Sequence, residues 1–175
     1  MLNIDGTYYL DEHRASDADR LAEVINDPEI ARNTLTIPYP YTKKDAEFWL
    51  QLCEQQQLLD LPQKQWVIRN RDGELCGGIG LHFKYGTDSH KDEIGYWLMR
   101  DLWGKGLMTT VVQKFVEFCT EERGLLRLEA PVFEFNTASA AVLKKNGFEL
   151  EGRLRKAYFK EGRFFDSLFY AKVTE

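Results

Sequence analysis

One stretch near the middle of the chain constrains the fold more than any other. Residues 93–99 are rich in aromatic and branched side chains, which predicts a strand, and residues 103–106 (Trp-Gly-Lys-Gly) predict a tight turn. From Met108 to Cys119 the apolar residues recur at helical spacing, which predicts an amphipathic helix. A strand that turns through glycines into a helix directs unpaired backbone N–H groups and the positive end of the helix dipole at one spot. The stretch therefore predicts an anion site, most naturally for phosphate.

Two common phosphate motifs fail on spacing at this turn. A P-loop needs Gly-Lys followed by Ser or Thr, whereas Gly106 follows Lys105 here. The dinucleotide fingerprint fails at its third glycine position, where the chain has Thr109. The remaining interpretation is a diphosphate bound by backbone N–H groups alone. A purely structural turn is the alternative, because glycines at such turns often serve geometry only.

The other elements predict a mixed α/β chain. Strands are expected at residues 7–10, 65–69, 75–85, 126–132, 148–159 and 163–173, and helices are expected to begin near Ser16, Thr42 and Asn136. The strand at 126–132 should run parallel to the strand at 93–99 through a right-handed crossover. With no repeat or linker visible, we expect a single domain over residues 1–175, built on a mixed, mostly antiparallel sheet of about seven strands with helices on both faces.

Pro131 adds an independent indication. It lies inside an expected central strand, where a residue without an N–H group would break a ladder hydrogen bond. The conflict disappears if the two central parallel strands splay apart toward their carboxyl ends. Such a splay leaves backbone groups free to bind an extended, amide-bearing ligand. A ligand with a diphosphate head and an amide-containing arm is coenzyme A.

Composition narrows the choice of partners. The formal net charge of −5 and the pI near 5.3 argue against a nucleic-acid partner and mildly favour cationic partners such as amines. The three cysteines have no paired spacing, so they predict reduced packing residues and neither a disulfide nor a metal site. Neither a signal peptide nor a membrane-spanning apolar run is visible, so we expect a cytoplasmic protein without a membrane partner.

Several motifs, in order along the chain, resemble those of the GNAT acetyltransferases. They are residues 93–98 (EIGYWL), 103–107 (WGKGL) and 136–148 (NTASAAVLKKNGF). Residues 37–46 and 152–166 also fit the branch that acetylates N-terminal amines of ribosomal proteins (RimJ/RimL-like). The resemblance implies the GNAT fold, with a splayed central parallel pair of strands, and acetyl-coenzyme A as the donor.

The resemblance also implies where acetyl-coenzyme A would bind. Its pantetheine arm would lie along Leu98 and Met99, and its sulfur near Ser139. Asn136 is expected to cap a helix and to contact the coenzyme as well. The backbone amides expected around the diphosphate are those of Trp103, Gly104, Lys105, Gly106, Leu107, Met108 and Thr109.

Amine acetylation needs a neutral nucleophile, a polarised thioester carbonyl and a proton for the departing thiolate. We expect Ser139 to supply that proton, although it could be only a small residue in the first helical turn. Strand alternation places Glu93 on the acceptor side of the cleft. We expect Glu93 to act as the base, directly or through water, with His82 as the alternative base. A main-chain N–H near Met99 is expected to hold the oxyanion. Without a cysteine at a motif position, the expected reaction is direct attack in a ternary complex.

The acceptor is less constrained. Tyr39, Tyr41, Trp49 and His82 are expected around the acceptor groove, although hydrophobic packing is the commoner role for such aromatic residues. The N-terminal α-amine of a protein or peptide is favoured, with a polyamine, an amino acid or an aminoglycoside as alternatives. A non-catalytic acyl-coenzyme A sensor is the rival class, because Met108 is bulky and Leu143 stands where many GNAT members place a tyrosine acid. The protein is expected to be a monomer or a homodimer.

Overall fold

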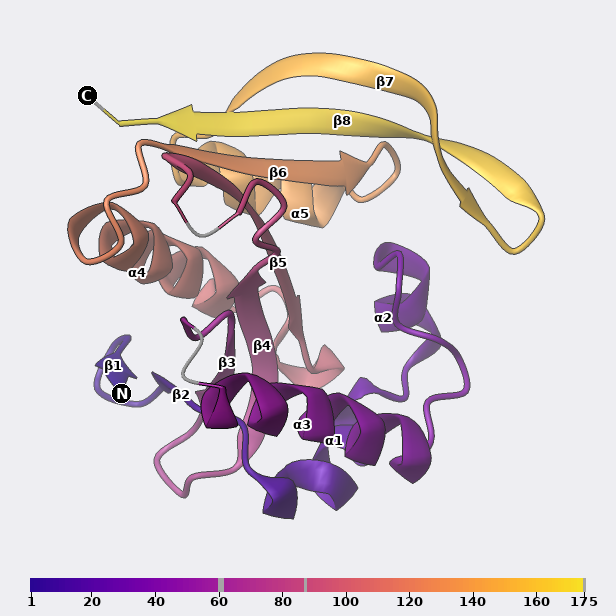
Figure 1. The fold of residues 1–175 in the computed structure, drawn as a ribbon. Coiled ribbons are helices and arrows are strands. Elements are labelled where there is room, and N and C mark those ends of the chain that lie inside the picture. The colour runs from indigo at the N-terminus through magenta and orange to yellow at the C-terminus, as the bar shows by residue number, and fades with distance from the viewer. Residues whose placement is uncertain (60–61, 87, 175) are drawn as a thin grey trace. The chain divides into compact units, whose positions relative to one another are not determined.

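The computed structural model describes residues 1–59, 62–86 and 88–174 of the 175-residue chain (Figure 1). Its strands are β1 (Leu2–Asn3), β2 (Tyr9–Asp11), β3 (Gln65–Arg69), β4 (Leu75–Leu81), β5 (Lys91–Leu98), β6 (Arg127–Phe133), β7 (Glu149–Lys160) and β8 (Arg163–Val173). Its α-helices are α1 (Ala18–Ile25), α2 (Pro28–Asn33), α3 (Lys43–Leu58), α4 (Leu107–Glu121) and α5 (Thr137–Lys145). Two short 3-10 helices, η1 (Ala15–Asp17) and η2 (Arg100–Leu102), precede α1 and the glycine turn.

The chain forms two compact units, both of which take residues from β4 and β5. Unit 1 comprises residues 1–80 and 96–105, and unit 2 comprises residues 81–95 and 106–175. Within the described residues the sheet has the strand order β1-β2-β3-β4-β5-β6-β8-β7. The expected single domain over residues 1–175 stays a prediction.

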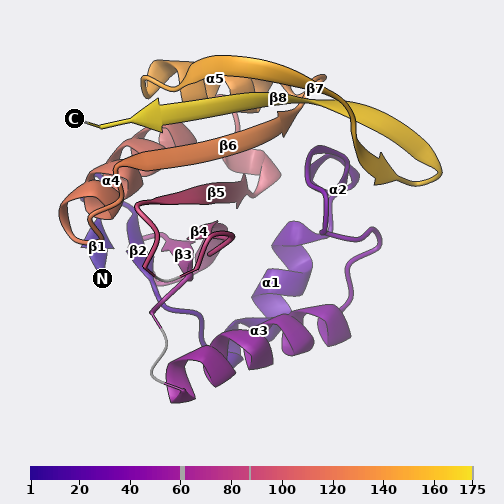
Figure 2. The same ribbon diagram turned by 45° about the horizontal axis from the view of Figure 1, so that its top comes forward.

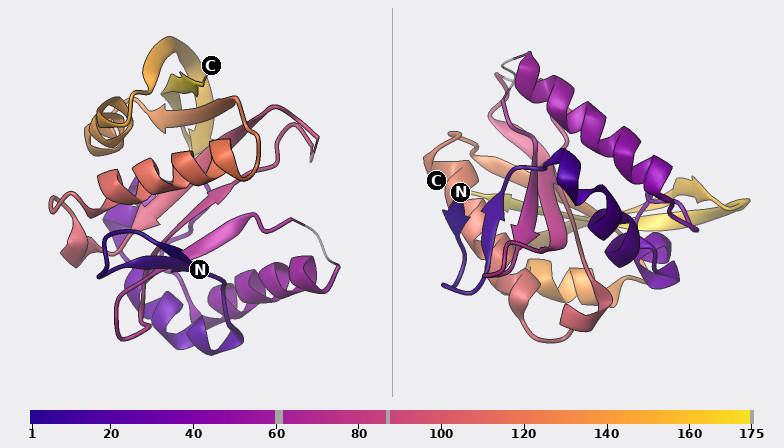
Figure 3. Two further views of the ribbon diagram at one scale, coloured as in Figure 1. Left: turned by 90° about the vertical axis from the view of Figure 1, so that its left-hand side faces the viewer. Right: turned by 90° about the horizontal axis from the view of Figure 1, so that it is seen from below.

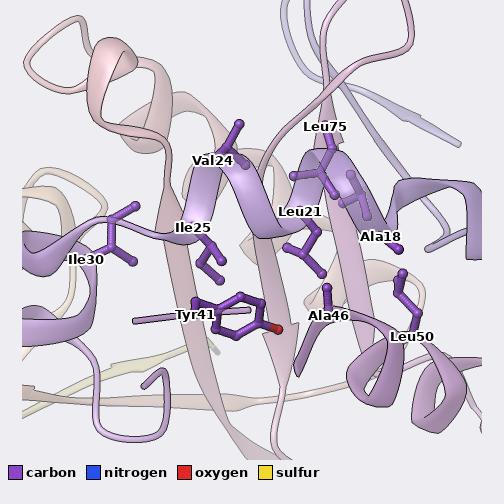
Figure 4. Packing of buried hydrophobic residues seen from close by; sticks show 10 residues of the cluster. Ala18, Leu21, Val24, Ile25, Ile30, Tyr41, Ala46, Leu50 and Leu75 are labelled. Carbon is purple, nitrogen blue, oxygen red and sulfur yellow. The ribbon is translucent and has the colours of Figure 1, made fainter. Parts of the chain in front are cut away.

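Unit 1 is built around helices α1 and α3, which pack against each other (Figures 1 and 3). Their facing residues form an apolar cluster that includes Leu21, Ile25 and Leu50 (Figure 4). At the end of β3, the buried Arg69 guanidinium donates two hydrogen bonds of 2.8 Å to the Asp17 carboxylate. The Arg69–Asp17 ion pair fixes η1 against β3, because breaking it would leave a buried charge without a partner.

Unit 2 is built around the parallel pair β5–β6 and the long hairpin β7–β8. The registered β5–β6 pairs run from Lys91↔Arg127 to Glu93↔Glu129 and stop there, although both strands continue. On its other side β6 pairs antiparallel with β8 along its whole length. Beyond β6, the β7–β8 hairpin continues to its tip (Figure 2).

Helix α4 buries one face, as its helical spacing predicts. Its buried residues are Leu107, Met108, Val111, Val112, Phe115, Val116 and Cys119. Among the described helices none is long and apolar enough to cross a membrane.

Most sequence-based expectations for the fold are confirmed. The parallel crossover, the helix Thr137–Lys145 and the hairpin around residues 161–162 are observed. The prediction of about seven strands is short by one among the described residues, since the two-residue strand β1 has little sequence signal. The strand expected at 75–85 ends at Leu81, because the following backbone turns at Phe83, whose φ is +49°.

Helix α1 begins near Ser16, as expected, but Ser16 is not its cap. The backbone first forms the 3-10 turn Ala15–Asp17. Pro28 opens α2, a short helix that the sequence did not predict, and the Asp27 side chain before it accepts hydrogen bonds from the N–H groups of Glu29 and Ile30. Proline is favoured in the first helical turn, so the same residue can mark either end of a helix.

Candidate acetyl-coenzyme A site

The first turn of α4 and the loop before it present a run of free backbone donors. None of the amides from Gly104 to Met108 donates a hydrogen bond within the described residues. Gly104 and Gly106 adopt φ values of +73° and +83°, a conformation that favours glycine. Gly106 is also the N-cap of α4, and no side chain caps the helix. Five consecutive free N–H groups at the positive end of a helix dipole match a diphosphate in both charge and donor chemistry.

The two ends of the expected amide run are occupied. The Trp103 N–H donates to the Arg100 carbonyl at 3.0 Å, and the Thr109 N–H donates to the Gly106 carbonyl at 3.0 Å. The run of amides available to a ligand, Gly104 to Met108, is therefore shorter than the run from Trp103 to Thr109 that was expected from the sequence. Met108 is only 9% exposed, so its bulky side chain packs in the interior.

Trp103 holds the start of this loop against unit 1. Its indole Nε1 donates to the Leu98 carbonyl at 2.7 Å, and its ring packs on the apolar cluster of that unit. The Arg100 guanidinium lies 4.7 Å from the Trp103 ring centroid, a cation–π contact. These contacts fix the backbone from which the free amides project.

The expected pantetheine residues lie at the end of β5 in unit 1. Leu98 is buried, and Met99 packs against the apolar cluster. The Met99 N–H donates to the Cys76 carbonyl at 2.8 Å. The oxyanion donor expected near Met99 is therefore not the Met99 N–H itself, because strand pairing with β4 already uses it.

Glu93 lies where β5 and β6 stop pairing. Glu93↔Glu129 is the last registered pair, and Pro131 follows two residues later on β6, past the paired stretch. Pro131 therefore removes no hydrogen bond from the β5 ladder, which is the behaviour expected of splayed strands. The loss of pairing starts within unit 2, at Ile94 and Gly95.

The imidazole of His82 lies over Gly95, on the face of β5 that carries Glu93. A Cβ atom added at Gly95 would lie 2.6 Å from His82 Nε2, so only glycine leaves room for the ring. Residues two apart on a strand share a face, which places His82 and Glu93 on the same side of β5. The two candidate bases are thus brought together, with His82 just beyond the end of β4.

Lys84 is a neighbour of Glu93 that sequence reasoning missed. Its Nζ donates to Glu93 Oε2 at 2.9 Å, and this hydrogen bond raises the pKa of Lys84. The buried Asp92 carboxylate accepts from the N–H groups of Phe83 and Lys84, which shapes the turn that carries Lys84. Glu93 Oε1 has no donor within the described residues, so it remains for a substrate or a water molecule.

Asn136 caps α5 as expected. Its Oδ1 accepts a hydrogen bond from the Ser139 N–H at 3.1 Å. Ser139 and Asn136 are both half-buried in unit 2, and Leu143, one turn beyond Ser139, is fully buried. A tyrosine at that position would need space that the interior does not offer.

Asn146 links α5 to the first turn of α4. Its Nδ2 donates to the Thr109 carbonyl at 3.2 Å and to the Val142 carbonyl at 2.9 Å. Lys172 in turn donates to the Asn146 carbonyl at 2.9 Å. Because Asn146 is buried, these bonds fix the start of α4 relative to the helix that carries Ser139.

The residues expected around the acceptor divide by burial. Tyr41 lies within the apolar cluster of unit 1, where burial raises its pKa to about 12 (Figure 4). Trp49 packs against the same cluster and meets the His13 ring edge-on at 6.1 Å. Tyr39 is 56% exposed. Packing thus accounts for Tyr41 and Trp49, and Tyr39 stays available to an acceptor.

The cysteines serve packing. All three are buried and free, and burial raises the pKa of Cys119 to about 12. A thiol with such a pKa is not a nucleophile at neutral pH. Within the residues that the structure describes, no group of three or more His, Cys, Asp or Glu side chains is placed to hold a metal ion.

The comparisons with known proteins identify the family. The family model described as acetyltransferase (GNAT) domain matches residues 8–149. An uncharacterised N-acetyltransferase of Bacillus subtilis, YoaA, is 36% identical over 110 residues, which are 62% of this chain and 62% of that protein. The L-amino acid N-acetyltransferase AaaT of Escherichia coli is 25% identical over 158 residues, 90% of this chain and 92% of that protein.

A solved structure shares the fold over almost the whole chain. RimL, described as a ribosomal L7/L12 alpha-N-protein acetyltransferase in complex with coenzyme A, superposes with a TM-score of 0.86 at 21% identity. The match covers 99% of this chain and 97% of RimL. The chain spans only about three fifths of the length of its relative YoaA.

Proposed function

Because this chain belongs to the GNAT acetyltransferase family, we propose that it transfers the acetyl group of acetyl-coenzyme A to a primary amine. The favoured acceptor is the N-terminal α-amine of a protein or peptide. The run of free amides from Gly104 to Met108 is the observation that carries the proposal, since a diphosphate would satisfy it. When bound, acetyl-coenzyme A supplies an activated thioester.

Different residues of unit 2 carry out the two proton transfers. Glu93, through a water molecule on Oε1, accepts the proton of the attacking amine, with His82 as the alternative base. The new C–N bond forms as the C–S bond breaks, Ser139 gives the departing sulfur its proton, and the amine proton taken up by Glu93 returns to Ser139 through water. Asn136 positions Ser139 through the cap, and Lys84 holds Glu93 Oε2. No covalent enzyme intermediate is needed, which fits the buried cysteines.

The cost of neutralising the amine favours an α-amine. An α-amine with a pKa near 8 costs about 1 kcal/mol to deprotonate at pH 7, whereas a lysine amine near 10.4 costs on the order of 4.6 kcal/mol. A carboxylate that acts through water suffices for the first and is weak for the second. Solved relatives of the same fold act on ribosomal proteins, which supports a protein N-terminus as the acceptor.

A free amino acid is the second candidate acceptor. The similarity to AaaT, which covers nine tenths of this chain, supports it. The reacting group is again an α-amine, so the same chemistry applies. The two acceptors differ in size, and a protein acceptor needs contacts beyond its first residues.

A thiol-release assay with a panel of peptides, amino acids and polyamines tests the proposal. We expect turnover on peptides with a free N-terminus and none on their N-acetylated forms. Glu93→Gln and Ser139→Ala should lower kcat while leaving the Kd for acetyl-coenzyme A nearly unchanged. Calorimetric binding of acetyl-coenzyme A without turnover on any amine would instead favour a non-catalytic sensor. No binding at all would contradict the proposal.

A further inference from the structure

The buried carboxylate of Glu129 takes no part in the proposed reaction, yet it is the centre of a polar cluster in unit 2. Glu129 lies on β6 and is 2% exposed. Its Oε1 accepts hydrogen bonds from Arg127 Nε at 2.7 Å and from Lys91 Nζ at 3.4 Å. Its Oε2 accepts a hydrogen bond from the hydroxyl of Tyr85. Because two cations already contact the Glu129 carboxylate, compensation of its buried charge does not require the Tyr85 hydroxyl.

Tyr85 reaches Glu129 by lying across β5. In the sheet β5 lies between β4 and β6, and Tyr85 belongs to the turn that follows β4. The Lys91 ammonium, which comes from β5, lies 3.9 Å from the centroid of the Tyr85 ring, a cation–π contact. The hydrogen bond to Glu129, together with burial, raises the pKa of Tyr85, so its hydroxyl remains a donor. Tyr85 thus connects the turn to β6 over the intervening strand.

The same turn carries Lys84, the partner of Glu93. The Lys84 N–H donates to the buried Asp92 carboxylate at 3.2 Å, which fixes the backbone on one side of the side chain. The hydroxyl of Tyr85, the next residue, fixes it on the other side through Glu129. Glu129 and Glu93 are registered neighbours in the parallel pair, so their side chains share a face of the sheet. These two anchors hold Lys84 Nζ at 2.9 Å from Glu93 Oε2, at the point where β5 and β6 stop pairing.

Exposure indicates that the Lys84–Glu93 pair orients the carboxylate more than it stabilises the fold. The Lys84 side chain is 53% exposed, and the Glu93 side chain is 15% exposed. An ion pair with one partner in solvent contributes little to stability. It does restrict the rotation of the Glu93 carboxylate, and a base with fewer conformations spends more time in the reactive one.

We propose that Tyr85 is a positioning residue for the acetyl transfer: its hydroxyl, bound to Glu129, fixes the turn from which Lys84 orients Glu93. This inference rests on the proposed function, in which Glu93 is the base. Tyr85 acts through Lys84 and contacts neither substrate. Loss of its hydroxyl should therefore slow the chemical step without weakening the binding of acetyl-coenzyme A or the amine.

Tyr85→Phe removes the hydroxyl and keeps the ring beside Lys91. With a peptide that has a free N-terminus, we expect kcat to fall about fivefold, while the KM for the peptide and the Kd for acetyl-coenzyme A stay within about twofold. Lys84→Met should lower kcat to a similar extent. In the Lys84→Met background, Tyr85→Phe should have no further effect on kcat, because the group through which it acts is absent.

Glu151→Gln is the matched control, because it loosens the same cluster from its outer side. Arg127 donates two hydrogen bonds to the Glu151 carboxylate, at 2.8 and 2.6 Å, and the substitution weakens this pair without changing Tyr85. We expect Glu151→Gln to keep the wild-type kcat. The inference is overturned if Tyr85→Phe keeps the wild-type kcat, if it lowers kcat equally with and without Lys84, or if Glu151→Gln lowers kcat as much.

NMR of the Lys84 side-chain ammonium tests the inference independently of turnover. A hydrogen-bonded ammonium exchanges its protons slowly with water, so Tyr85→Phe should raise the exchange rate at Lys84 Nζ about fivefold, and Glu151→Gln should not. An unchanged rate in Tyr85→Phe would overturn the inference. If the wild-type protein acetylates no amine, or if Glu93→Gln keeps full kcat, the proposed function fails instead, and the exchange rate still tests the link between Tyr85 and Lys84.

Discussion

Helices α4 and α5, both in unit 2, begin in opposite ways. At α5 the amides of Thr137, Ser139 and Ala140 all donate to nearby oxygens, and Asn136 supplies a side-chain cap. At α4 the cap is a glycine, and the amides from Gly104 to Met108 have no acceptor among the described residues. The protein itself supplies acceptors for the amides at the start of α5, and it leaves the amides at the start of α4 free among the described residues.

The difference separates stability from function. A side-chain cap stabilises a helix by about 1 kcal/mol. The start of α4 forgoes that gain and keeps its donors free, which is the arrangement that an anion site requires.

The largest effect is expected when both glycines of the loop become alanine. Gly104→Ala with Gly106→Ala places side chains at φ values of +73° and +83°. Such backbone costs about 1–2 kcal/mol per residue, so relaxation of the loop should raise the Kd for acetyl-coenzyme A by about thirtyfold or more. Isothermal titration calorimetry measures the change.

Two other glycines provide the matched control. Gly6→Ala with Gly124→Ala introduces side chains at φ values of +78° and +65°, with no atom within 4 Å of either Cβ. Gly124 lies beyond the opposite end of α4. This variant should lose stability to a similar extent and keep its affinity. An equal loss of affinity in both variants would reduce the effect to general destabilisation.

A negative charge in the first turn of α4 should act on stability and binding in opposite directions. Thr109→Glu favours the helix dipole by about 0.3–1 kcal/mol and repels a diphosphate. We expect a slightly higher urea midpoint and an affinity for acetyl-coenzyme A lower by about tenfold. Thr109→Gln is the uncharged control. If Thr109→Glu kept its affinity, the anion would not bind at this helix start.

At α5 the same kind of change should act mainly on stability. Asn136→Ala removes the acceptor for the Ser139 N–H, which should lower the free energy of unfolding by about 1 kcal/mol. Asn136→Ser keeps a capping oxygen and should restore stability. Because it lacks the amide NH₂ group, we expect its Kd for acetyl-coenzyme A to rise about fivefold. An unchanged Kd would limit Asn136 to capping.

The smallest effect is expected for the pH dependence of stability that comes from the start of α3. Hydrogen bonds from the Thr42 hydroxyl and N–H hold the pKa of Asp45 below its usual value. Because the folded-state pKa is depressed, the stability that this cap supplies is present above about pH 4 and lost as the pH falls through the lowered pKa. Relative to the wild type, Asp45→Asn should show a smaller fall in Tm between neutral and acidic pH. Parallel curves would contradict the capping role.

Sequence predicted those backbone features of the candidate site whose signals are local. The glycine turn, the cap at Asn136 and the proline on β6 each depend on one backbone rule, and the structure shows each feature. The sequence did not reveal the Lys84–Glu93 ion pair or the Asn146–Thr109 hydrogen bond. Both depend on which distant segments fold against each other, and no spacing rule encodes that information.

Burial explains the other differences. Tyr41 was expected near the acceptor because it lies in an aromatic, proline-containing segment, but its ring is part of the core of unit 1. An aromatic residue has the same local signal whether it meets a substrate or a helix.

Residue-resolved hydrogen exchange at the start of α4, without and with coenzyme A, measures whether these amides bind the ligand. The account predicts fast exchange of the amides from Gly104 to Met108 in the free protein and strong protection when coenzyme A is bound. The amides of Ser139 and Ala140 should be protected in both states. Binding of coenzyme A with no added protection at residues 104–108 would contradict the account.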